Sequence, residues 1–340
     1  MDRFASLERW IASLYPNTSP EITPASADAS FRRYFRLNFD NGLPSRIVMD
    51  APPDKEDCRP FIAVAALLEA ATINVPRVLR HDLQQGFLLL TDLGSRTYLA
   101  ALREEPRSAD TLYGDAIAAL LRMQQRTACT ALPPYDRTRL LREMELLPDW
   151  YIARHRGFEL SERQRAGLSG CFEALLANNL AQAQVFVHRD YHSRNLMVCG
   201  HSPGQGGNPG VLDFQDAVCG PLTYDLASLL KDAYIEWEEE RVLDWCIRYW
   251  EAARKAGLPI APGFGDFYRD FEWMGLQRHL KILGIFARLH HRDGKDQYLA
   301  DLPLTMRYAR KTCERYAALL PLLRILDAVE KADLQTGYTF

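Results

Sequence analysis

The sequence predicts an α+β fold in two lobes, a small β-rich N-lobe over residues 1–93 and a large, mostly helical C-lobe over residues 94–340. Three observations predict this division. Short β-type segments separated by turn residues fill the N-terminal part. Apolar residues recur at helical spacing through most of the remainder. A chain of 340 residues is also long enough to build more than one modest core.

The overall charge gives no indication of a polyanionic partner. Lysine and arginine number 41 against 44 aspartates and glutamates, so no general field attracts nucleic acid or an anionic membrane. No apolar run approaches the roughly 20 residues that span a bilayer, and Glu8 and Arg9 interrupt the apolar N-terminus where a signal peptide is continuous. Seven scattered cysteines without a CxxC pair favour reduced thiols over a zinc site. We therefore expect a cytoplasmic monomer without a nucleic-acid or membrane partner.

The N-lobe is predicted to be a small sheet with packed helices. Asn41-Gly42 between two β-type segments is a strong hairpin signal, and Pro60 suits the first turn of a helix. Residues 18–29 are rich in Ser, Thr, Pro and Ala, which predicts a loop. The expected elements, in order, are a helix from Phe4 to Leu14, strands at Tyr34–Phe39 and Arg46–Met49, a helix over Lys55–Ala71, and strands at Pro76–Leu79 and Phe87–Leu90.

The C-lobe is predicted to consist of long helices around a few short strands. Ser108 is a residue type that caps helices, and one face of the helix after it is apolar, from Leu112 to Met123. The Gly- and Pro-rich segment 201–210 is an enlarged hairpin loop or a linker, and its closely flanking strands favour the hairpin. Further helices are expected around 139–153, 161–179, 223–236, 239–256, 266–291 and 303–329, with strands at Val185–Val187, Leu196–Val198 and Val211–Leu212.

Two polar segments follow apolar strands directly. His188–Asn195 lies between the strands VFV and LMV, and Asp213 emerges from the strand Val211–Leu212. Phosphoryl transfer needs a carboxylate to accept the proton of the attacking hydroxyl and Mg²⁺ to neutralise the phosphates, and Mg²⁺ prefers hard oxygen ligands. Asp190 is therefore predicted to be the catalytic base, and Asn195 and Asp213 the Mg²⁺ ligands.

These motifs resemble the aminoglycoside phosphotransferase-like branch of the protein-kinase-like fold. The resemblance rests on HxDxxxxN at His188–Asn195, on Leu212-Asp213-Phe214, and on the Gly-x-x-x-x-Asp-Leu-Ala segment that begins at Gly220. It covers nearly the whole chain and implies ATP as the phosphate donor. His188 and Asp225 are expected to support the loop, His192 braces the loop or contacts the substrate, and Asp216 is a candidate supporting carboxylate.

The resemblance also implies a nucleotide site in the N-lobe. The loop before the first hairpin (Ser30, Phe31, Arg32, Arg33) is placed over the phosphates, with an ordinary turn as the alternative, and Leu90, Thr91, Asp92 and Leu93 form the adenine-binding hinge. Kinases usually carry a lysine on the next strand, but Arg46-Ile47-Val48-Met49-Asp50 has none. Arg32, Arg33 or Arg46 is the candidate replacement.

The acceptor site is expected in the C-lobe. Arg278 and Lys281 lie in a basic stretch with Trp273, which suits a sugar carrying a carboxylate and an acetamido group, while a solvated helix face is the alternative. Glu143 and Glu145 precede Trp150 and Tyr151 and are candidate partners of sugar hydroxyls, with ordinary helix surface charge as the alternative.

A narrower resemblance points to the same acceptor. Ser30–Arg36, Met49–Pro53, Pro148–Tyr151 and Trp273–Lys281 are similar to the anomeric amino-sugar kinases of bacterial cell-wall recycling. That similarity implies transfer of the γ-phosphate of ATP to the C1 hydroxyl of N-acetylmuramate or N-acetylglucosamine. The alternatives are an aminoglycoside or choline-type phosphotransferase and, given the missing lysine, an inactive kinase-like binding protein.

Overall fold

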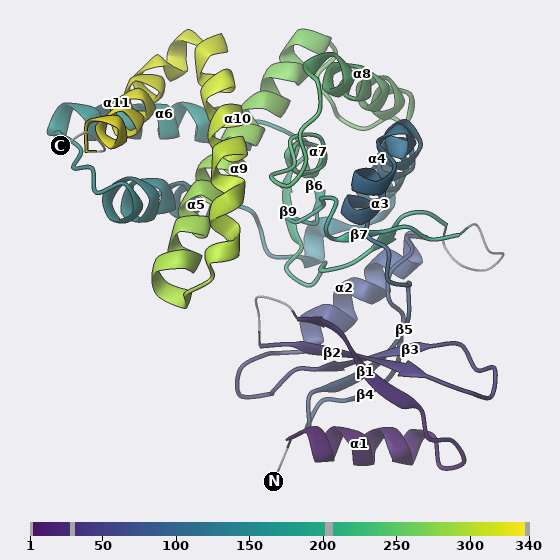
Figure 1. Ribbon diagram of the computed structural model, residues 1–340. Coiled ribbons are helices and arrows are strands. Elements are labelled where there is room, and N and C mark those ends of the chain that lie inside the picture. Colours follow the sequence, from purple (N-terminus) through teal and green to yellow (C-terminus); the bar gives the residue numbers. More distant parts are fainter. Residues whose placement is uncertain (1–2, 28–30, 201–206, 337–340) are drawn as a thin grey trace. The chain divides into compact units, whose positions relative to one another are not determined.

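The computed structural model describes residues 3–27, 31–200 and 207–336 (Figure 1). By its internal contacts the chain divides into two compact units. Unit 1 comprises Met1–Met123 and Asn195–Asp216, and unit 2 comprises Gln124–Arg194 and Ala217–Phe340. Unit 1 thus extends past the predicted lobe boundary at residue 93, which stays a prediction.

Unit 1 is built on a five-stranded antiparallel sheet with the strand order β1-β2-β3-β5-β4. Helix α1 lies across one face of this sheet and α2 against the other (Figure 1). Leu7 and Ile11 of α1 pack on Leu37, Val48 and Phe87 of the strands. The strands are β1 (Glu21–Ala27), β2 (Arg33–Asn38), β3 (Arg46–Asp50), β4 (Val78–Asp82) and β5 (Phe87–Thr91), and the helices are α1 (Arg3–Leu14) and α2 (Arg59–Ala70).

The predicted hairpin and both helices of this sheet are confirmed. Strands β2 and β3 pair antiparallel across the Asn41-Gly42 turn, and α2 carries Pro60 at its start. The apolar face predicted for α2 is the face that the structure buries, with Phe61, Val64, Ala65 and Leu68.

The prediction of a loop over residues 18–29 is wrong, because Glu21–Ala27 forms strand β1. It pairs antiparallel with β2, with Ile22 opposite Leu37, and its register shifts between Pro24 and Ser26. Pro24 has no N–H for a strand ladder, but β1 is an edge strand, where a proline is tolerated. Residues 28–30 lie outside the described residues.

Unit 1 also holds a short helix and a hairpin that follow the sheet in sequence. Helix α3 (Tyr98–Glu104), which the sequence did not predict, is capped by Thr97, whose hydroxyl oxygen accepts the N–H of Ala100 at 3.2 Å. Strands β7 (Leu196–Met197) and β8 (Gly210–Val211) pair antiparallel. This pairing confirms that their connection is a hairpin loop; residues 201–206 of it lie outside the described residues.

Unit 2 is mostly helical, with one two-stranded sheet formed by β6 and β9. Helix α9 packs against α5, α6, α7, α8, α10 and a π-helical segment. The helices are α5 (Arg137–Met144), α6 (Glu162–Leu180), α7 (Tyr224–Leu230), α8 (Glu239–Lys255), α9 (Phe264–Asp293), α10 (Leu302–Arg315) and α11 (Leu320–Thr336). The π-helical segment is Leu147–His155, and the strands are β6 (Gln184–Val187) and β9 (Val218–Pro221). Helix α4 (Ala109–Arg126) belongs to unit 1 up to Met123, and its last three residues belong to unit 2. Short 3₁₀ turns lie at Pro106–Ser108, Cys129–Ala131, Asp296–Asp301 and Ala317–Leu319.

Three predicted helices of unit 2 differ from the structure. The helix expected over 139–153 ends at Met144, and Pro148 stands at the start of the π-helical segment after it. The helix expected over 303–329 is broken, since Pro321 has no N–H to continue the helical ladder. The helix expected over 223–236 ends at Leu230, after which Asp232 accepts backbone and side-chain hydrogen bonds from Ser193.

Two further observations bear on the sequence predictions. Cys129 and Cys219 are joined by a disulfide, so the expectation that all cysteines are reduced thiols is wrong for this pair. Among the described residues, no helix combines the length and the apolar character needed to cross a membrane.

Candidate active site

The loop after β6 is held by hydrogen bonds to one buried carboxylate. Asp225, in the first turn of α7, accepts the backbone N–H of His188 at 2.6 Å and that of Arg189 at 3.0 Å. The ring of His188 accepts the N–H of Asp190 at 3.2 Å through Nδ1. Arg189 has a φ of 79°, which side chains rarely adopt. These bonds hold a strained backbone in place, and such strain clusters at functional sites.

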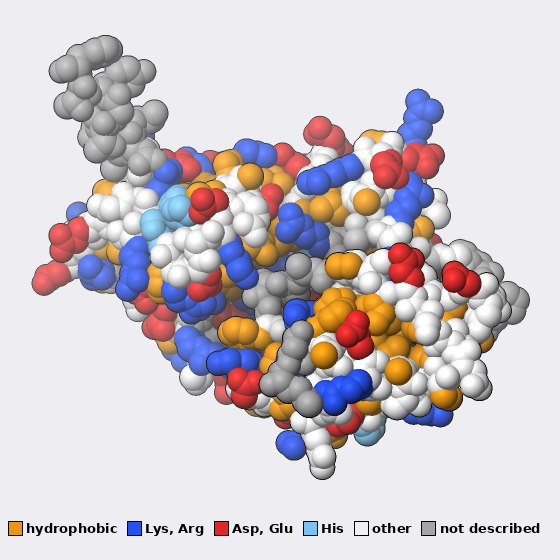
Figure 2. Space-filling view, turned by 60° about the horizontal axis from the view of Figure 1, so that its bottom comes forward, with side chains coloured by type: hydrophobic (Ala, Val, Ile, Leu, Met, Phe, Trp, Pro, Cys, Tyr) orange, Lys and Arg blue, Asp and Glu red, His pale blue; other side chains and the backbone are white. Residues whose placement is uncertain are grey.

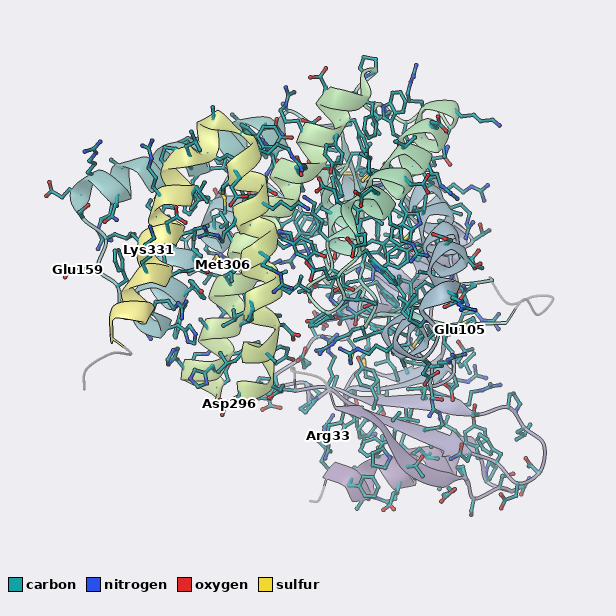
Figure 3. All side chains as sticks on the ribbon, turned by 45° about the horizontal axis from the view of Figure 1, so that its top comes forward. Arg33, Glu105, Glu159, Asp296, Met306 and Lys331 are labelled. Carbon is teal, nitrogen blue, oxygen red and sulfur yellow. A yellow bond between two sulfur atoms is a disulfide. The ribbon has the colours of Figure 1, made fainter. Side chains whose placement is uncertain are left out.

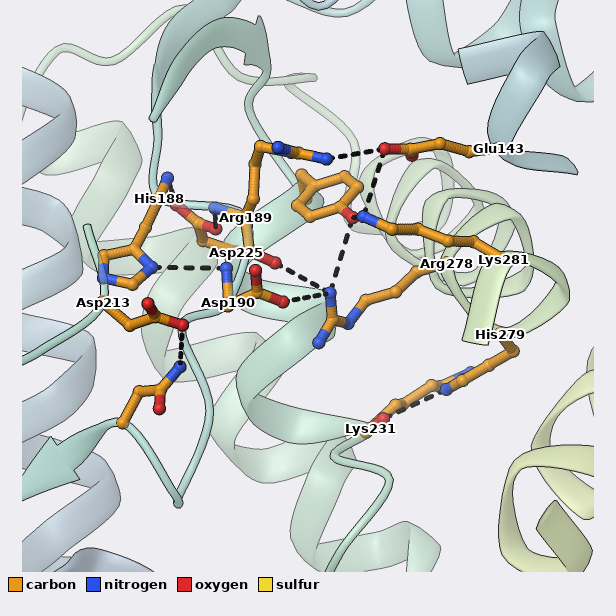
Figure 4. Close-up of polar contacts among 12 residues, drawn as sticks. Glu143, His188, Arg189, Asp190, Asp213, Asp225, Lys231, Arg278, His279 and Lys281 are labelled. Carbon is orange, nitrogen blue, oxygen red and sulfur yellow. Dashed lines mark hydrogen bonds and ion pairs between the residues drawn. The ribbon is translucent and has the colours of Figure 1, made fainter. Parts of the chain in front are cut away.

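The carboxylate of Asp190 stands beside cations from α9 (Figure 4). Its Oδ1 lies 3.7 Å from Nη1 of Arg278, and its side chain is 40% exposed. Desolvation raises the pKa of Asp190, but Lys281 and Arg278 outweigh it and hold the pKa below its usual range. The Asp190 carboxylate is therefore ionised, able to accept a proton, and accessible to solvent.

Arg278 and Lys281 are almost completely buried, with 4% and 6% of their surfaces exposed. The alternative of a solvated basic face is therefore wrong for these two residues. Arg278 donates to the carbonyl of Arg189 at 2.7 Å, and Lys281 donates to the hydroxyl of Tyr224 at 3.1 Å. Both cations therefore bind neighbouring groups from buried positions in unit 2: Arg278 the loop backbone and Tyr224, and Lys281 Tyr224.

Glu143 of α5 balances this buried positive charge. Its Oε1 accepts a hydrogen bond from Arg189 at 2.7 Å and lies 3.2 Å from Nζ of Lys281 (Figure 4). Tyr135 donates to its other oxygen. Burial raises the pKa of Glu143, but Lys281 and Arg189 lower it further, so the net shift is downward. Glu143 thus ties α5, α9 and the loop together as an ionised carboxylate.

The remaining part of the loop packs inward. Ser193 donates both its N–H, at 3.0 Å, and its hydroxyl, at 2.5 Å, to Asp232. His192 is buried, and its ring meets Tyr234 edge-on with the centroids 5.2 Å apart. Burial lowers the pKa of His192 to about 4, so the imidazole is neutral near pH 7.

In unit 1 the structure brings Asn195 and Asp213 together. Asn195 donates from Nδ2 to Oδ2 of Asp213 at 3.3 Å, and its carbonyl accepts the N–H of Leu212 at 2.9 Å. Gln215 donates to Oδ1 of Asp213 at 2.7 Å, and Asp213 has a φ of 62°. Mg²⁺ takes few protein ligands and completes its shell with phosphates and water. The Asp213 carboxylate suits this ion, and Asn195 would add its amide oxygen by turning the amide away from its hydrogen bond to Asp213.

The candidate phosphate-binding arginines have different partners. Arg32 lies 3.9 Å from Asp213 and 4.0 Å from Glu56. Arg33, labelled in Figure 3, pairs with Asp50 at 2.5 Å, and Arg46 donates to the carbonyl of Ser45 at 3.1 Å. Ser30 lies outside the described residues, and the ring of its neighbour Phe31 is exposed.

The predicted hinge residues continue from the end of β5. Leu90 is buried, and the carbonyl of Arg77 accepts the N–H of Thr91 at 3.0 Å. Asp92 accepts the guanidinium of Arg36 at 2.7 Å and the N–H of Gly94 at 2.9 Å, which makes it a turn residue. Leu93 follows at half exposure.

Several predicted acceptor residues have partners away from the Asp190 network. Trp150 stacks under Arg154, with the guanidinium 4.1 Å from the ring centroid. Trp273 meets Tyr316 edge-on at 5.7 Å. Glu145 and Asp216 are exposed.

Tyr151 is buried and packs on a histidine cluster instead. Its ring lies 5.7 Å from that of His155, which in turn contacts His290 and His291. Figure 2 shows a cluster of histidine side chains on the face of the molecule in view. Glu143 was expected to be either a partner of sugar hydroxyls or helix surface charge. The surface-charge alternative is wrong for this residue, because Glu143 is buried and pairs with Arg189 and Lys281.

The chain is similar in sequence to known phosphotransferases. Residues 21–260 match the phosphotransferase enzyme family. The chain is 48% identical to a protein of Neisseria meningitidis serogroup B named N-acetylmuramate/N-acetylglucosamine kinase, over 100% of both chains. It is also 48% identical to a protein of the same name from Pseudomonas aeruginosa, over 96% of this chain and 97% of the relative.

The fold is shared with solved aminoglycoside phosphotransferases. The GDP complex of aminoglycoside 2'-phosphotransferase-IIIa superposes with a TM-score of 0.60 at 13% identity, covering 93% of this chain and 100% of that one. This likeness confirms the predicted α+β protein-kinase-like fold. The chain belongs to the phosphotransferase enzyme family.

Proposed function

We propose that the protein is an ATP-dependent kinase that phosphorylates the C1 hydroxyl of N-acetylmuramate and N-acetylglucosamine. Relatives of that name match the chain along its whole length. The proposal includes a cytoplasmic monomer that acts in peptidoglycan recycling. The observation that carries it is the accessible Asp190 carboxylate, kept ionised by buried cations.

In the proposed reaction, the C1 oxygen of the sugar attacks the γ-phosphorus of ATP. A new O–P bond forms, the bond from the γ-phosphorus to the bridging oxygen breaks, and ADP leaves with that electron pair. Asp190 accepts the proton of the C1 hydroxyl. Its low pKa suits this role because the proton moves late in such a reaction, so position matters more than basicity.

Asn195 and Asp213 are the residues that would hold Mg²⁺ in this proposal. The ion supplies charge neutralisation at the phosphate oxygens. Gln215, bonded to Asp213 at 2.7 Å, fixes the orientation of that carboxylate.

The charge around Asp190 supports an acceptor that is not a polycation. Glu143 is paired with Arg189 and Lys281, and Asp190 lies beside Arg278, so both carboxylates are already matched by cations. They do not offer the unpaired negative charge that a cationic aminoglycoside or choline calls for. N-acetylmuramate and N-acetylglucosamine are not cationic.

A substrate panel tests the proposal. The purified protein is incubated with Mg·ATP and, separately, with N-acetylmuramate, N-acetylglucosamine, kanamycin and choline, and the products are analysed by ³¹P and ¹³C NMR. We expect turnover of both sugars and a C1 resonance split by phosphorus. Turnover of kanamycin or choline without turnover of either sugar would overturn the proposal, as would phosphorylation at another hydroxyl.

A further inference from the structure

Strand β3 (Arg46–Asp50) contains no lysine, so a cation of unit 1 that binds nucleotide phosphates has to be an arginine or come from another element. Phosphoryl transfer depends on cations that hold the phosphates and stabilise the charge that develops on them. Three arginines of unit 1, at positions 32, 33 and 46, are candidates by sequence. Their partners in the structure differentiate them.

Arg33 and Arg46 have partners other than the proposed metal ligand Asp213. Arg33 is paired with Asp50, whose buried carboxylate also accepts a hydrogen bond from Nε of Arg3 at 2.6 Å. Asp50 therefore collects two guanidinium groups at the end of β3. Arg46 donates to the carbonyl of the preceding residue, Ser45.

Arg32 lies between two acidic residues from distant parts of unit 1. Its Nη2 is 3.9 Å from Oδ1 of Asp213, and its Nε is 4.0 Å from Oε2 of Glu56. Its side chain is only 11% exposed. Glu56 is fixed in turn by the backbone N–H of Phe31, which donates to Oε1 at 3.2 Å.

Both distances are within the range of an ion pair, so the two carboxylates attract and orient the guanidinium. A planar guanidinium with five donors matches phosphate oxygens in a fork geometry. Asp213 is the proposed Mg²⁺ ligand, so Arg32 stands at the place where metal-bound phosphates would lie.

We propose that Arg32 is the phosphate-binding cation of this kinase and that Glu56 is its positioning residue. The proposal rests on the proposed function for the identity of the nucleotide reaction. The acidic partner precedes α2 and the cation immediately precedes β2, so the positive charge comes from the segment that enters β2 and not from β3. Asp213 links this pair to the metal site.

Four variants test this assignment: Arg32→Gln, Arg32→Lys, Glu56→Gln and the control Arg59→Gln. Arg59 also lies near the start of α2, but its side chain is 79% exposed and paired with Asp57. Binding of Mg·ATP and of adenosine is measured by calorimetry, and the kcat and KM for ATP and for N-acetylmuramate are measured by coupled assay.

We expect Arg32→Gln to lower kcat/KM for ATP by about 100-fold, the typical effect of removing one preorganised electrostatic contact. Its affinity for Mg·ATP falls while its affinity for adenosine and the KM for the sugar are unchanged, because only phosphate contacts are lost. Arg32→Lys restores part of the activity, since charge returns without the fork. Glu56→Gln gives a smaller loss of the same kind, and Arg59→Gln matches the wild type.

Two results overturn the assignment. One is wild-type Mg·ATP affinity and kcat/KM in Arg32→Gln. The other is a parallel loss of adenosine, ATP and sugar binding, which indicates a purely structural role. Thermal unfolding is measured for each variant, and if Arg32→Gln does not fold, Arg32→Lys and Glu56→Gln carry the same comparison. The calorimetry does not depend on the acceptor, so an inactive wild type would contradict the proposed function while the Mg·ATP measurement still decides the role of Arg32.

Discussion

Arg278 contacts both Asp190 and the residue before it: Nη1 lies 3.7 Å from the Asp190 carboxylate and donates at 2.7 Å to the carbonyl of Arg189. This buried guanidinium thus holds the backbone that carries Asp190 and, together with Lys281, keeps the carboxylate ionised. Because Arg278 is on α9, the long central helix of unit 2 determines where the proposed base stands.

The first prediction concerns pH. Asp190 must be ionised to accept a proton, and Lys281 and Arg278 together lower its pKa, so wild-type kcat should show no acidic limb from this group near neutral pH. Arg278→Met removes a cation, which raises the pKa of Asp190. We expect the acidic limb of kcat to move to higher pH and kcat at pH 7.5 to fall by about 10- to 100-fold through misplacement of the carboxylate.

The measurement is kcat against pH with saturating substrates. Arg269→Gln is the control, since Arg269 is on the same helix and pairs with Asp266 at the surface. An unchanged pH profile in Arg278→Met would show that Arg278 does not control the ionisation of Asp190.

The second prediction concerns Glu143. Glu143→Gln leaves the buried Lys281 and the partly buried Arg189 without their carboxylate, which should destabilise the protein by about 3 kcal/mol. The folded-state pKa of Glu143 is depressed, so its stabilisation is present above the unfolded pKa and is lost as the pH falls through the folded pKa. The difference in stability between wild type and variant should therefore shrink in acid.

Urea unfolding at pH 7.5 and in acid checks this prediction. Glu159→Gln, at an exposed position labelled in Figure 3, is the control and should lie within about 0.5 kcal/mol of wild type. Equal stabilities of Glu143→Gln and wild type at pH 7.5 would show that the network is not held by this charge.

The third prediction concerns the proposed metal ligands. Asp213→Ala removes a carboxylate that Asn195 and Gln215 orient. We expect Mg·ATP affinity to fall by at least about tenfold while metal-free adenosine binding is retained. Titration of Mg²⁺ at fixed ATP measures the effect, and an unaltered Mg²⁺ dependence would contradict the ligand assignment.

The fourth prediction tests the close packing of α9. A Cβ at Gly284 would lie 2.4 Å from the backbone of Leu146, too close for any side chain, so Gly284→Ala should cost about 1–3 kcal/mol or more. Gly265 is on the same helix with open space around it, and Gly265→Ala should be neutral or stabilising by up to about 1 kcal/mol. Equal melting temperatures for the two variants would refute the close contact.

Local patterns were enough to predict the antiparallel hairpin and the buried face of α2, because turn chemistry and apolar spacing act within a few residues. Strand β1 was missed because Pro24 and its small neighbours resemble a loop. That segment is a strand because it pairs with β2, with Ile22 opposite Leu37. The residues of one strand alone do not predict which other segment it pairs with.

The site shows the same limit. Asp190, Asn195 and Asp213 were proposed from spacing. The sequence could not predict that Arg32 lies near Asp213 while Arg33 pairs with Asp50. Adjacent side chains of an extended chain face opposite sides, so a shift of one residue in the position of the strand would exchange their partners. Glu143 looked like helix surface charge because its cations, Arg189 and Lys281, come from distant segments.

The most direct measurement is made on Asp190→Ala with Mg·ATP and N-acetylmuramate. The account predicts that kcat falls by at least about 100-fold, the contribution of a general base, while the Kd for Mg·ATP stays within about twofold of wild type. A variant that keeps near-normal kcat would contradict the assignment of Asp190 as the base.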